Sequence, residues 1–238
     1  MASVIQKVAR MAHQTFSRKM NDDSLNQLKS CFASVTAEDI DFNGEAIEKR
    51  TDLIAPAIFM DIHNTSIFTL SLFAVREGQK LPLHDHPGMY GLIRVIHGAF
   101  KVKSYTRLDP QTISPPPEEM RGRVSTFFSR FRRFKNNGPL PAILSDERIV
   151  TASDQDVCVL TPDDRNIHEL TSLTSLSAFV DILAPPYEDK VRDCHFYSIL
   201  GVSFDQKLGR EVTWLVETEA PMSYWSEEIP YTGPSISL

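Results

Sequence analysis

The sequence predicts an all-β protein, a barrel or sandwich of short strands that is preceded by helices. From about residue 54, short runs rich in β-branched and aromatic residues alternate with turn residues, and no helical period separates them. A chain of 238 residues is long enough for one such barrel and its core. The runs that we expect to form strands are Ala57–Ile62, Ser66–Val75, Gly91–Ile96, Ala99–Thr106, Val157–Leu160, Ser177–Leu183, Cys194–Leu200 and Glu211–Val216.

Residues 1–50 are expected to form a helical segment that packs on the barrel. The start of the chain, up to Lys19, is basic, lacks acidic side chains and carries apolar residues at helical spacing. A mitochondrial transit peptide has a similar composition, but a docked amphipathic helix is the interpretation that we prefer. A second helix is expected from Asp22 or Asp23, both suitable N-cap residues, to near Phe32.

Residues 51–238 are expected to form the barrel domain, with a long insertion at about 109–147. The run Pro115–Pro117 excludes a central strand near the start of this insertion. Residues 121–135 then combine arginines with phenylalanines. Such a stretch can bind an anionic partner or nucleic acid. We prefer a loop that lays its phenylalanines on the barrel and leaves its arginines in water.

The overall charge and the cysteines limit the classes of function. A net charge of −6 and a pI of about 5.6 make binding to the phosphate backbone of nucleic acid a poor expectation. No apolar run is long enough to cross a membrane. Cys31, Cys158 and Cys194 are odd in number and widely spaced, which argues for a reducing compartment. We expect a cytoplasmic monomer, with the nucleus and the mitochondrion as open alternatives.

The stretch with the most chemical information is His84-Asp85-His86. In a β-strand, side chains two residues apart point to the same face, so His84 and His86 can reach one point while Asp85 points away. Two neutral imidazoles that converge on one ion are the beginning of a transition-metal site. Two surface histidines beside a turn would give the same pattern, and the neighbouring residues have to decide between these interpretations.

Those neighbouring residues resemble the first motif of the cupins, which consists of a glycine, His-x-His, usually a glutamate, and a further glycine. Gly78 precedes the histidine pair, and Gly91 follows it before a short apolar strand. The position of the glutamate falls on Tyr90 or Gly91, and neither residue has a carboxylate. Cupins that lack this glutamate include the thiol dioxygenases, whose iron is held by three histidines.

A site with three histidines needs one more imidazole. Besides the pair, the chain contains His13, His63, His97, His168 and His195. His168 follows Leu160-Thr-Pro and a short polar segment, which resembles the second cupin motif, where a proline turn returns one histidine to the metal. The neighbouring Glu169 would point to the other face of a strand.

Motifs along nearly the whole chain resemble one family, the 2-aminoethanethiol (cysteamine) dioxygenases. They are Met1–Arg10, Pro82–Met89, the Pro-rich insertion from Asp109, Leu160–Pro162, Asn166–His168, Asp181–Tyr187 and Arg192–His195. The resemblance implies a cupin barrel (a double-stranded β-helix or jelly roll) and Fe(II) bound by His84, His86 and His168. It also implies that O₂ oxidises cysteamine to hypotaurine, or the N-terminal cysteine of proteins to the sulfinic acid, a reaction that feeds oxygen-dependent degradation.

The residues support this chemistry independently of the resemblance. Three imidazoles on one side of an iron ion leave the open positions that O₂ chemistry requires. A site without a carboxylate ligand is also more positive, which favours a thiolate. Oxidation of a thiol to a sulfinate supplies all four electrons that O₂ needs, and the sequence has no fingerprint of a flavin or nicotinamide site.

Three further residues are candidates for the active site. Asp181 lies in an apolar run, where a carboxylate is costly to bury without a partner. It can steer a substrate ammonium, or it can be a sheet-edge residue in water. Tyr187 follows two prolines and can place its phenol at the pocket mouth. Some thiol dioxygenases carry a cysteine–tyrosine thioether, but the partner position for Cys194 is Phe196, so we expect a free thiol.

Two other functions are kept open. A non-catalytic cupin that binds a metal or ligand as a sensor would use the same histidines. A cupin isomerase or hydrolase would usually keep the glutamate ligand. For a dioxygenase, cysteamine and N-terminal cysteine peptides remain equal candidates, whereas free L-cysteine is expected to be a poor substrate. Arg76 and Arg94 are the side chains that could bind its carboxylate and contradict this expectation.

Overall fold

Two helices begin the chain in the computed structural model, which describes residues 2–18, 20–123 and 138–238. Helix α1 (Val4–Phe16) begins after Ser3, whose side chain accepts a hydrogen bond from the amide of Gln6. Helix α2 (Asp22–Phe32) has the predicted bounds, but its N-cap is Asn21. A short 3₁₀ helix, Glu38–Ile40, and helix α3 (Gly44–Glu48) follow.

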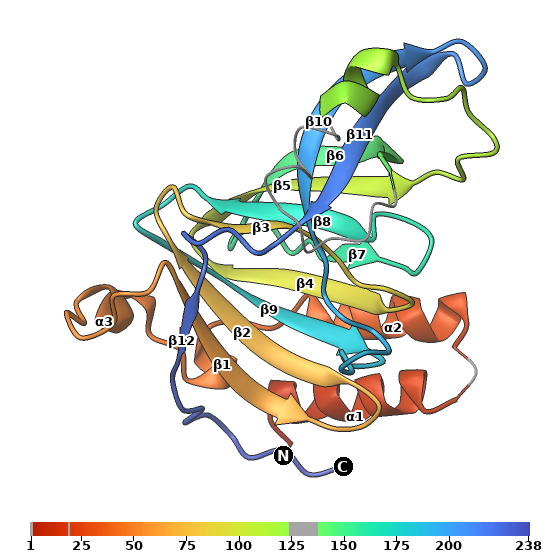
Figure 1. Cartoon of the computed structure of the whole chain (residues 1–238). Coiled ribbons are helices and arrows are strands. Elements are labelled where there is room, and N and C mark those ends of the chain that lie inside the picture. Colours follow the sequence, from red (N-terminus) through yellow and green to blue (C-terminus); the bar gives the residue numbers. More distant parts are fainter. Residues whose placement is uncertain (1, 19, 124–137) are drawn as a thin grey trace.

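Two sheets that face one another form the barrel (Figure 1). All strand pairs are antiparallel except β1 with β12. In order across the first sheet, the strands are β12 (Ser226–Glu228), β1 (Ala57–Asn64), β2 (Thr69–Arg76), β9 (Leu176–Ala184), β4 (Tyr90–His97) and β7 (Cys158–Leu160). The second sheet contains, in order, β10 (Phe196–Asp205), β11 (Arg210–Thr218), β6 (Leu140–Thr151), β5 (Ala99–Arg107), β8 (Ile167–Ser172) and β3 (Lys80–Asp85), and it closes on itself through the pairing of β3 with β10. This arrangement is the predicted cupin barrel.

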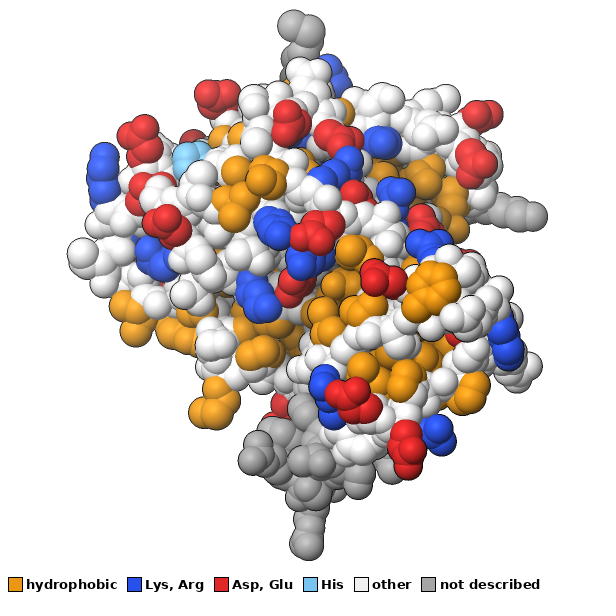
Figure 2. All heavy atoms as spheres, turned by 90° about the horizontal axis from the view of Figure 1, so that it is seen from above, with side chains coloured by type: hydrophobic (Ala, Val, Ile, Leu, Met, Phe, Trp, Pro, Cys, Tyr) orange, Lys and Arg blue, Asp and Glu red, His pale blue; other side chains and the backbone are white. Residues whose placement is uncertain are grey.

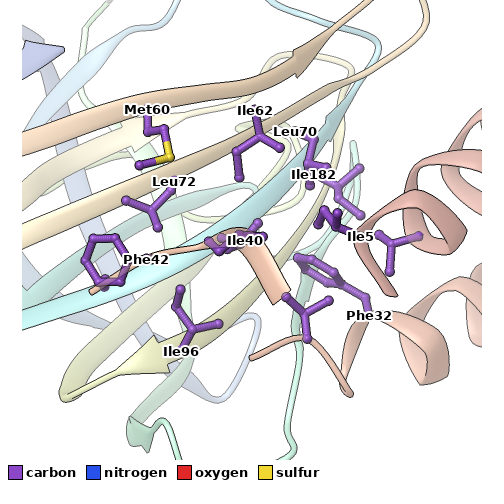
Figure 3. Close-up of a cluster of buried hydrophobic side chains, with 14 of the residues drawn as sticks. Ile5, Phe32, Ile40, Phe42, Met60, Ile62, Leu70, Leu72, Ile96 and Ile182 are labelled. Carbon is purple, nitrogen blue, oxygen red and sulfur yellow. The ribbon is translucent and has the colours of Figure 1, made fainter. Parts of the chain in front are cut away.

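Strand β9 shows how the first sheet is buried on both sides. Every residue of this strand is buried. Val180 and Ile182 belong to the core cluster that contains Ile5 and Phe32 of the helices (Figure 3). Phe179 belongs to a second cluster, inside the barrel. Because side chains alternate along a strand, Asp181 shares the inner face with Phe179.

The segment that follows β5 differs from the expectation. Strand β6 occupies Leu140–Thr151, so the last part of the expected insertion is a strand of the barrel, and the connection runs from residue 108 to 139. Of the basic and aromatic stretch 121–135, only residues 121–123 lie within the described residues, so both interpretations of it stay predictions.

Hydrogen bonds at two sites link segments that are distant in the sequence. The guanidinium of Arg94, on β4, is buried and donates hydrogen bonds to the carbonyls of four residues, Ala33, Val95, Ala152 and Asp154. This joins the end of α2 to the barrel. Near the chain ends, which lie side by side in Figure 1, Gln6 donates to the carbonyl of Ser237 and accepts from its amide, both at 2.8 Å.

No helix among the described residues is long and apolar enough to span a membrane.

Candidate metal centre

Three histidine side chains meet inside the barrel. His84 on β3 and His168 on β8 are opposite each other in the strand register, and His86 follows just after β3. Each ring offers one nitrogen, and these nitrogens all lie within 4.8 Å of one another. The Nε2 atoms of His86 and His168 are 3.0 Å apart. The structure therefore brings together the three histidines that the sequence singled out, and they could hold a metal ion.

The remaining histidines lie elsewhere. His13 is on helix α1 and His63 is near the end of β1. His97 ends β4, and its Nε2 is 3.7 Å from the carboxylate of Glu48. His195 lies outside the cluster, where its Nδ1 is 3.1 Å from the carboxylate of Asp85.

Hydrogen bonds fix which nitrogen faces the centre in two of the rings. The Nδ1 of His84 lies 2.7 Å from the carbonyl of Pro82, so Nδ1 carries the proton and Nε2 keeps its lone pair. The Nδ1 of His86 lies 2.7 Å from the hydroxyl of Tyr187, which donates its own proton to the carbonyl of Asp85. His86 must then donate from Nδ1, and its Nε2 is also free. Such outer partners orient metal-binding imidazoles.

Burial keeps these rings neutral. It lowers the pKa of His84 and, more strongly, the pKa values of His86 and His168, where the neighbouring histidines add to the effect. Neutral imidazoles with free nitrogens are the form that binds transition metals such as zinc, copper, iron and nickel. The donor set therefore fits a transition metal, with no carboxylate in the cluster among the described residues.

The histidines form one wall of a mostly apolar cavity of about 120 Å³. The other lining side chains are Phe73, Leu81, Pro82, Ile93, Phe179, Asp181, Leu183, Tyr187, Cys194, Phe196 and Tyr224. Asp181 is buried, and its Oδ1 atom has no hydrogen-bond partner among the described residues. Burial raises the pKa of this carboxyl to about 7. A buried acceptor without a partner suits a ligand that brings a donor.

The described lining of the cavity contains no lysine or arginine. The two arginines that could have bound a substrate carboxylate are engaged elsewhere. Arg76 donates to the carbonyls of Leu53 and Ala55. Arg94 donates only to the backbone carbonyls described above, on the helix side of its sheet.

Tyr187 and Cys194 lie beside each other at the cavity. Tyr187 lines the cavity and also contacts the ring of His86, a contact that no pattern in the sequence predicts. Burial raises the pKa of the Cys194 thiol to about 11. Phe196 covers His84, with ring centroids 6.2 Å apart. Tyr224 also lines the cavity, but it comes from an irregular C-terminal segment in which no motif marks it.

Comparison with known proteins gives a family model and a set of relatives that agree with one another. The family model described as PCO_ADO matches residues 19–236. The chain is 33% identical to 2-aminoethanethiol dioxygenase of Mus musculus and 31% identical to that of Homo sapiens, over 99% of this chain and 97% of each relative. It is 22% identical to plant cysteine oxidase 1 of Arabidopsis thaliana, over 74% of this chain and 55% of the relative.

Among solved structures, KdgF from Halomonas sp. matches with a TM-score of 0.36 and 13% identity, over 57% of this chain and 84% of that chain. The family match covers more than half of this chain, and the mammalian relatives exceed 30% identity over nearly all of it. On these two grounds, this chain belongs to the PCO_ADO family of thiol dioxygenases.

Proposed function

We propose that this protein is an Fe(II)-dependent dioxygenase that oxidises the thiol of a 2-aminoethanethiol group to a sulfinate. The substrate is cysteamine, which would give hypotaurine, or the N-terminal cysteine of a peptide or protein. His84, His86 and His168 bind the iron, and Asp181 and Tyr187 act on the substrate. One observation carries this proposal: three neutral imidazoles and a buried carboxylate whose Oδ1 has no described partner line the same small cavity.

The three imidazoles support a site that keeps the full charge of its metal, because none of the ligands is an anion. Fe(II) bound there would supply positions at which a thiolate and O₂ meet, which is the proximity contribution to catalysis. The reaction consumes one thiol and one O₂, both oxygen atoms enter the sulfinic acid, and the sulfur supplies the four electrons. No separate reductant is needed.

Asp181 supports an amine-bearing substrate. Its carboxylate lies in the same cavity as the histidines, and its free Oδ1 can accept a hydrogen bond from an ammonium. The thiol and amine of the 2-aminoethanethiol group are only two carbons apart, so a small cavity can bind both ends at once. In this arrangement Asp181 fixes the amine, and the side chain of Tyr187 lines the same cavity.

The lining of the cavity also supports discrimination against free L-cysteine. Free cysteine adds a carboxylate next to the amine, whereas a peptide has a neutral amide there. With no cationic side chain in the described lining, Asp181 repels this carboxylate in its ionised form, which predominates above its pKa of about 7. The mammalian relatives are named for 2-aminoethanethiol, which fits the first substrate, whereas the name of the plant relative mentions cysteine without distinguishing an N-terminal residue from the free amino acid.

The surface and the cysteines support the rest of the proposal. On the face shown in Figure 2, acidic and basic side chains are interspersed, which favours a small or peptide substrate over nucleic acid. Cys31, Cys158 and Cys194 are free thiols in the described structure, which is the form that cysteines keep in the reducing cytoplasm.

The test is O₂ consumption by the Fe(II)-loaded protein with four compounds side by side: cysteamine, a peptide that begins with cysteine, the same peptide beginning with serine, and free L-cysteine. We expect turnover of the first two, with a product heavier by two oxygen atoms. The serine peptide controls for thiol-independent uptake. Iron binding without thiol-dependent O₂ consumption would instead favour the non-catalytic sensor.

A further inference from the structure

Asp85 stands between two of the proposed iron ligands, yet its carboxylate points out of the cavity. Its Oδ1 accepts a hydrogen bond from the backbone amide of His195 at 2.9 Å and lies 3.1 Å from the ring nitrogen Nδ1 of the same residue. Its Oδ2 accepts from the hydroxyl of Tyr197 at 2.8 Å. The carboxylate therefore binds the start of β10, the strand that closes the second sheet against β3.

The contact with the amide of His195 replaces a backbone hydrogen bond. Phe196 is opposite His84 in the antiparallel register, which places His195 opposite Asp85. The amide of Asp85 donates to the carbonyl of His195 at 3.1 Å, as in a hydrogen-bonded pair. A regular pair of this kind exchanges two such bonds. Here the amide of His195 donates to the side chain of Asp85 instead of to its carbonyl.

The carbonyl of Asp85 is thereby left for another donor, the hydroxyl of Tyr187, at 2.7 Å. A hydroxyl has a single proton to donate, so once Tyr187 donates to this carbonyl it can only accept from Nδ1 of His86. That direction leaves the lone pair of His86 on Nε2, the atom that faces His168. If Tyr187 donated to Nδ1 instead, Nε2 would carry the proton and could not bind a metal.

We propose that Asp85 is a positioning residue that sets the metal-binding tautomer of His86 through Tyr187. Its carboxylate takes over the strand pairing with His195, which frees the carbonyl of Asp85 to hold the hydroxyl of Tyr187. The inference rests on the proposed function in one respect, namely that His86 is a metal ligand. It adds a structural cause for the tautomer of His86. The side chain of Asp85, which does not touch the metal, controls this tautomer through the pairing of β3 with the segment that begins β10.

The test is a double-mutant cycle, read out as the dissociation constant for Fe(II), titrated anaerobically against a chromogenic chelator. Tyr187→Phe removes the hydroxyl, and we expect the affinity to fall by about 10- to 100-fold, the usual effect of removing an outer partner of a ligand. The Fe(II) affinity of Asp85→Ala should fall by a factor in the same range. Without the carboxylate, the amide of His195 donates to the backbone carbonyl of residue 85 and displaces the hydroxyl of Tyr187. In the double variant the losses should not add, since both changes break one chain of contacts.

Two matched variants separate this role from general stabilisation. Asp85→Asn keeps an oxygen acceptor for the amide of His195, so it should retain most of the affinity. Tyr197→Phe removes the other hydrogen bond of the carboxylate but leaves that of His195, so its affinity should equal that of the parent protein. Circular dichroism and thermal unfolding of each metal-free variant report whether it is folded.

Additive losses in the cycle would overturn the proposal, as would a Tyr197→Phe variant that loses as much affinity as Asp85→Ala. If Asp85→Ala does not fold, Asp85→Asn is compared with Tyr187→Phe instead. Equal losses of Fe(II) affinity in these two variants contradict the proposal. A small loss in Asp85→Asn beside a large loss in Tyr187→Phe supports it. A parent protein that binds no Fe(II) would refute the proposed metal site itself, a result distinct from all of these.

Discussion

Replacing Asp181 by asparagine should make the metal-free protein more stable at neutral pH while impairing its activity. In the folded protein burial raises the pKa of this carboxyl from its ordinary value of 3.8 to about 7. A carboxyl whose pKa is higher in the folded state binds its proton more tightly there. The folded state is therefore disfavoured as pH rises from about 4 through 7, and Asp181→Asn has no such dependence.

The size of the effect follows from the pKa difference. One pKa unit corresponds to about 1.4 kcal/mol, so the change from 3.8 to about 7 corresponds to roughly 4 kcal/mol once the carboxyl is ionised in both states. The penalty is partly present at pH 5, and between pH 5 and pH 8 the stability difference between the two proteins should widen by about 2–3 kcal/mol in favour of the variant.

The assay is urea-induced unfolding of the metal-free parent and Asp181→Asn proteins at pH 5 and pH 8, with chelator present. In parallel, steady-state kinetics of the Fe(II)-loaded proteins should show a higher KM or a lower kcat for cysteamine in the variant, at unchanged iron content. A stability difference that stays constant with pH would refute the inference that burial raises the pKa of this carboxyl in the folded protein. Loss of iron in the variant would refute its assignment to the substrate.

The remaining predictions concern the metal, the substrate and the buried arginine. His168→Ala should lose both Fe(II) and thiol-dependent O₂ uptake, whereas the control His97→Ala keeps both; iron retained by His168→Ala would show that another residue is the third ligand. Free L-cysteine should have a kcat/KM at least ~10-fold below that of cysteamine, as expected for carboxylate repulsion of about 1.4 kcal/mol or more, and equal values would contradict this. Arg94→Met should lower the free energy of unfolding by about 3 kcal/mol or more, since four backbone carbonyls at buried or partly buried sites lose their charged donor; urea unfolding beside the exposed control Lys49→Met measures this.

Local patterns in the sequence were sufficient to predict most of the fold. The helix from Asp22 and the strand around Ala57 bury side chains on one face. The strands around Gly91 and Ser177 are short apolar runs that are buried almost throughout, another pattern typical of strands. Strand β6 could not be predicted from the sequence, for a physical reason. It carries Pro141 and several charged residues, and only three of its twelve residues are buried, so it lacks the apolar alternation of an inner strand.

Some features of the candidate site could likewise be predicted from local sequence, and others could not. The proximity of His84 and His86 follows from strand geometry, and a motif pointed to His168. The pairing of His84 with His168 joins β3 to β8, two strands that are distant in the chain, and only the folded structure shows it. The same holds for the contacts of Asp85 with His195 and Tyr197, which span about 110 residues. Nothing local to either segment indicates such partners.

The paired hydrogen bonds between Gln6 and Ser237 have a consequence for protein engineering. Helix α1 buries Ile5 and Val8 in the core, so its docking is worth far more than these two bonds. The bonds nevertheless make the C-terminal tail part of the surface on which α1 sits. Removing the last residues, or fusing a bulky carrier to Leu238, should therefore loosen the opposite end of the polypeptide first, and protease cleavage within α1 would report it.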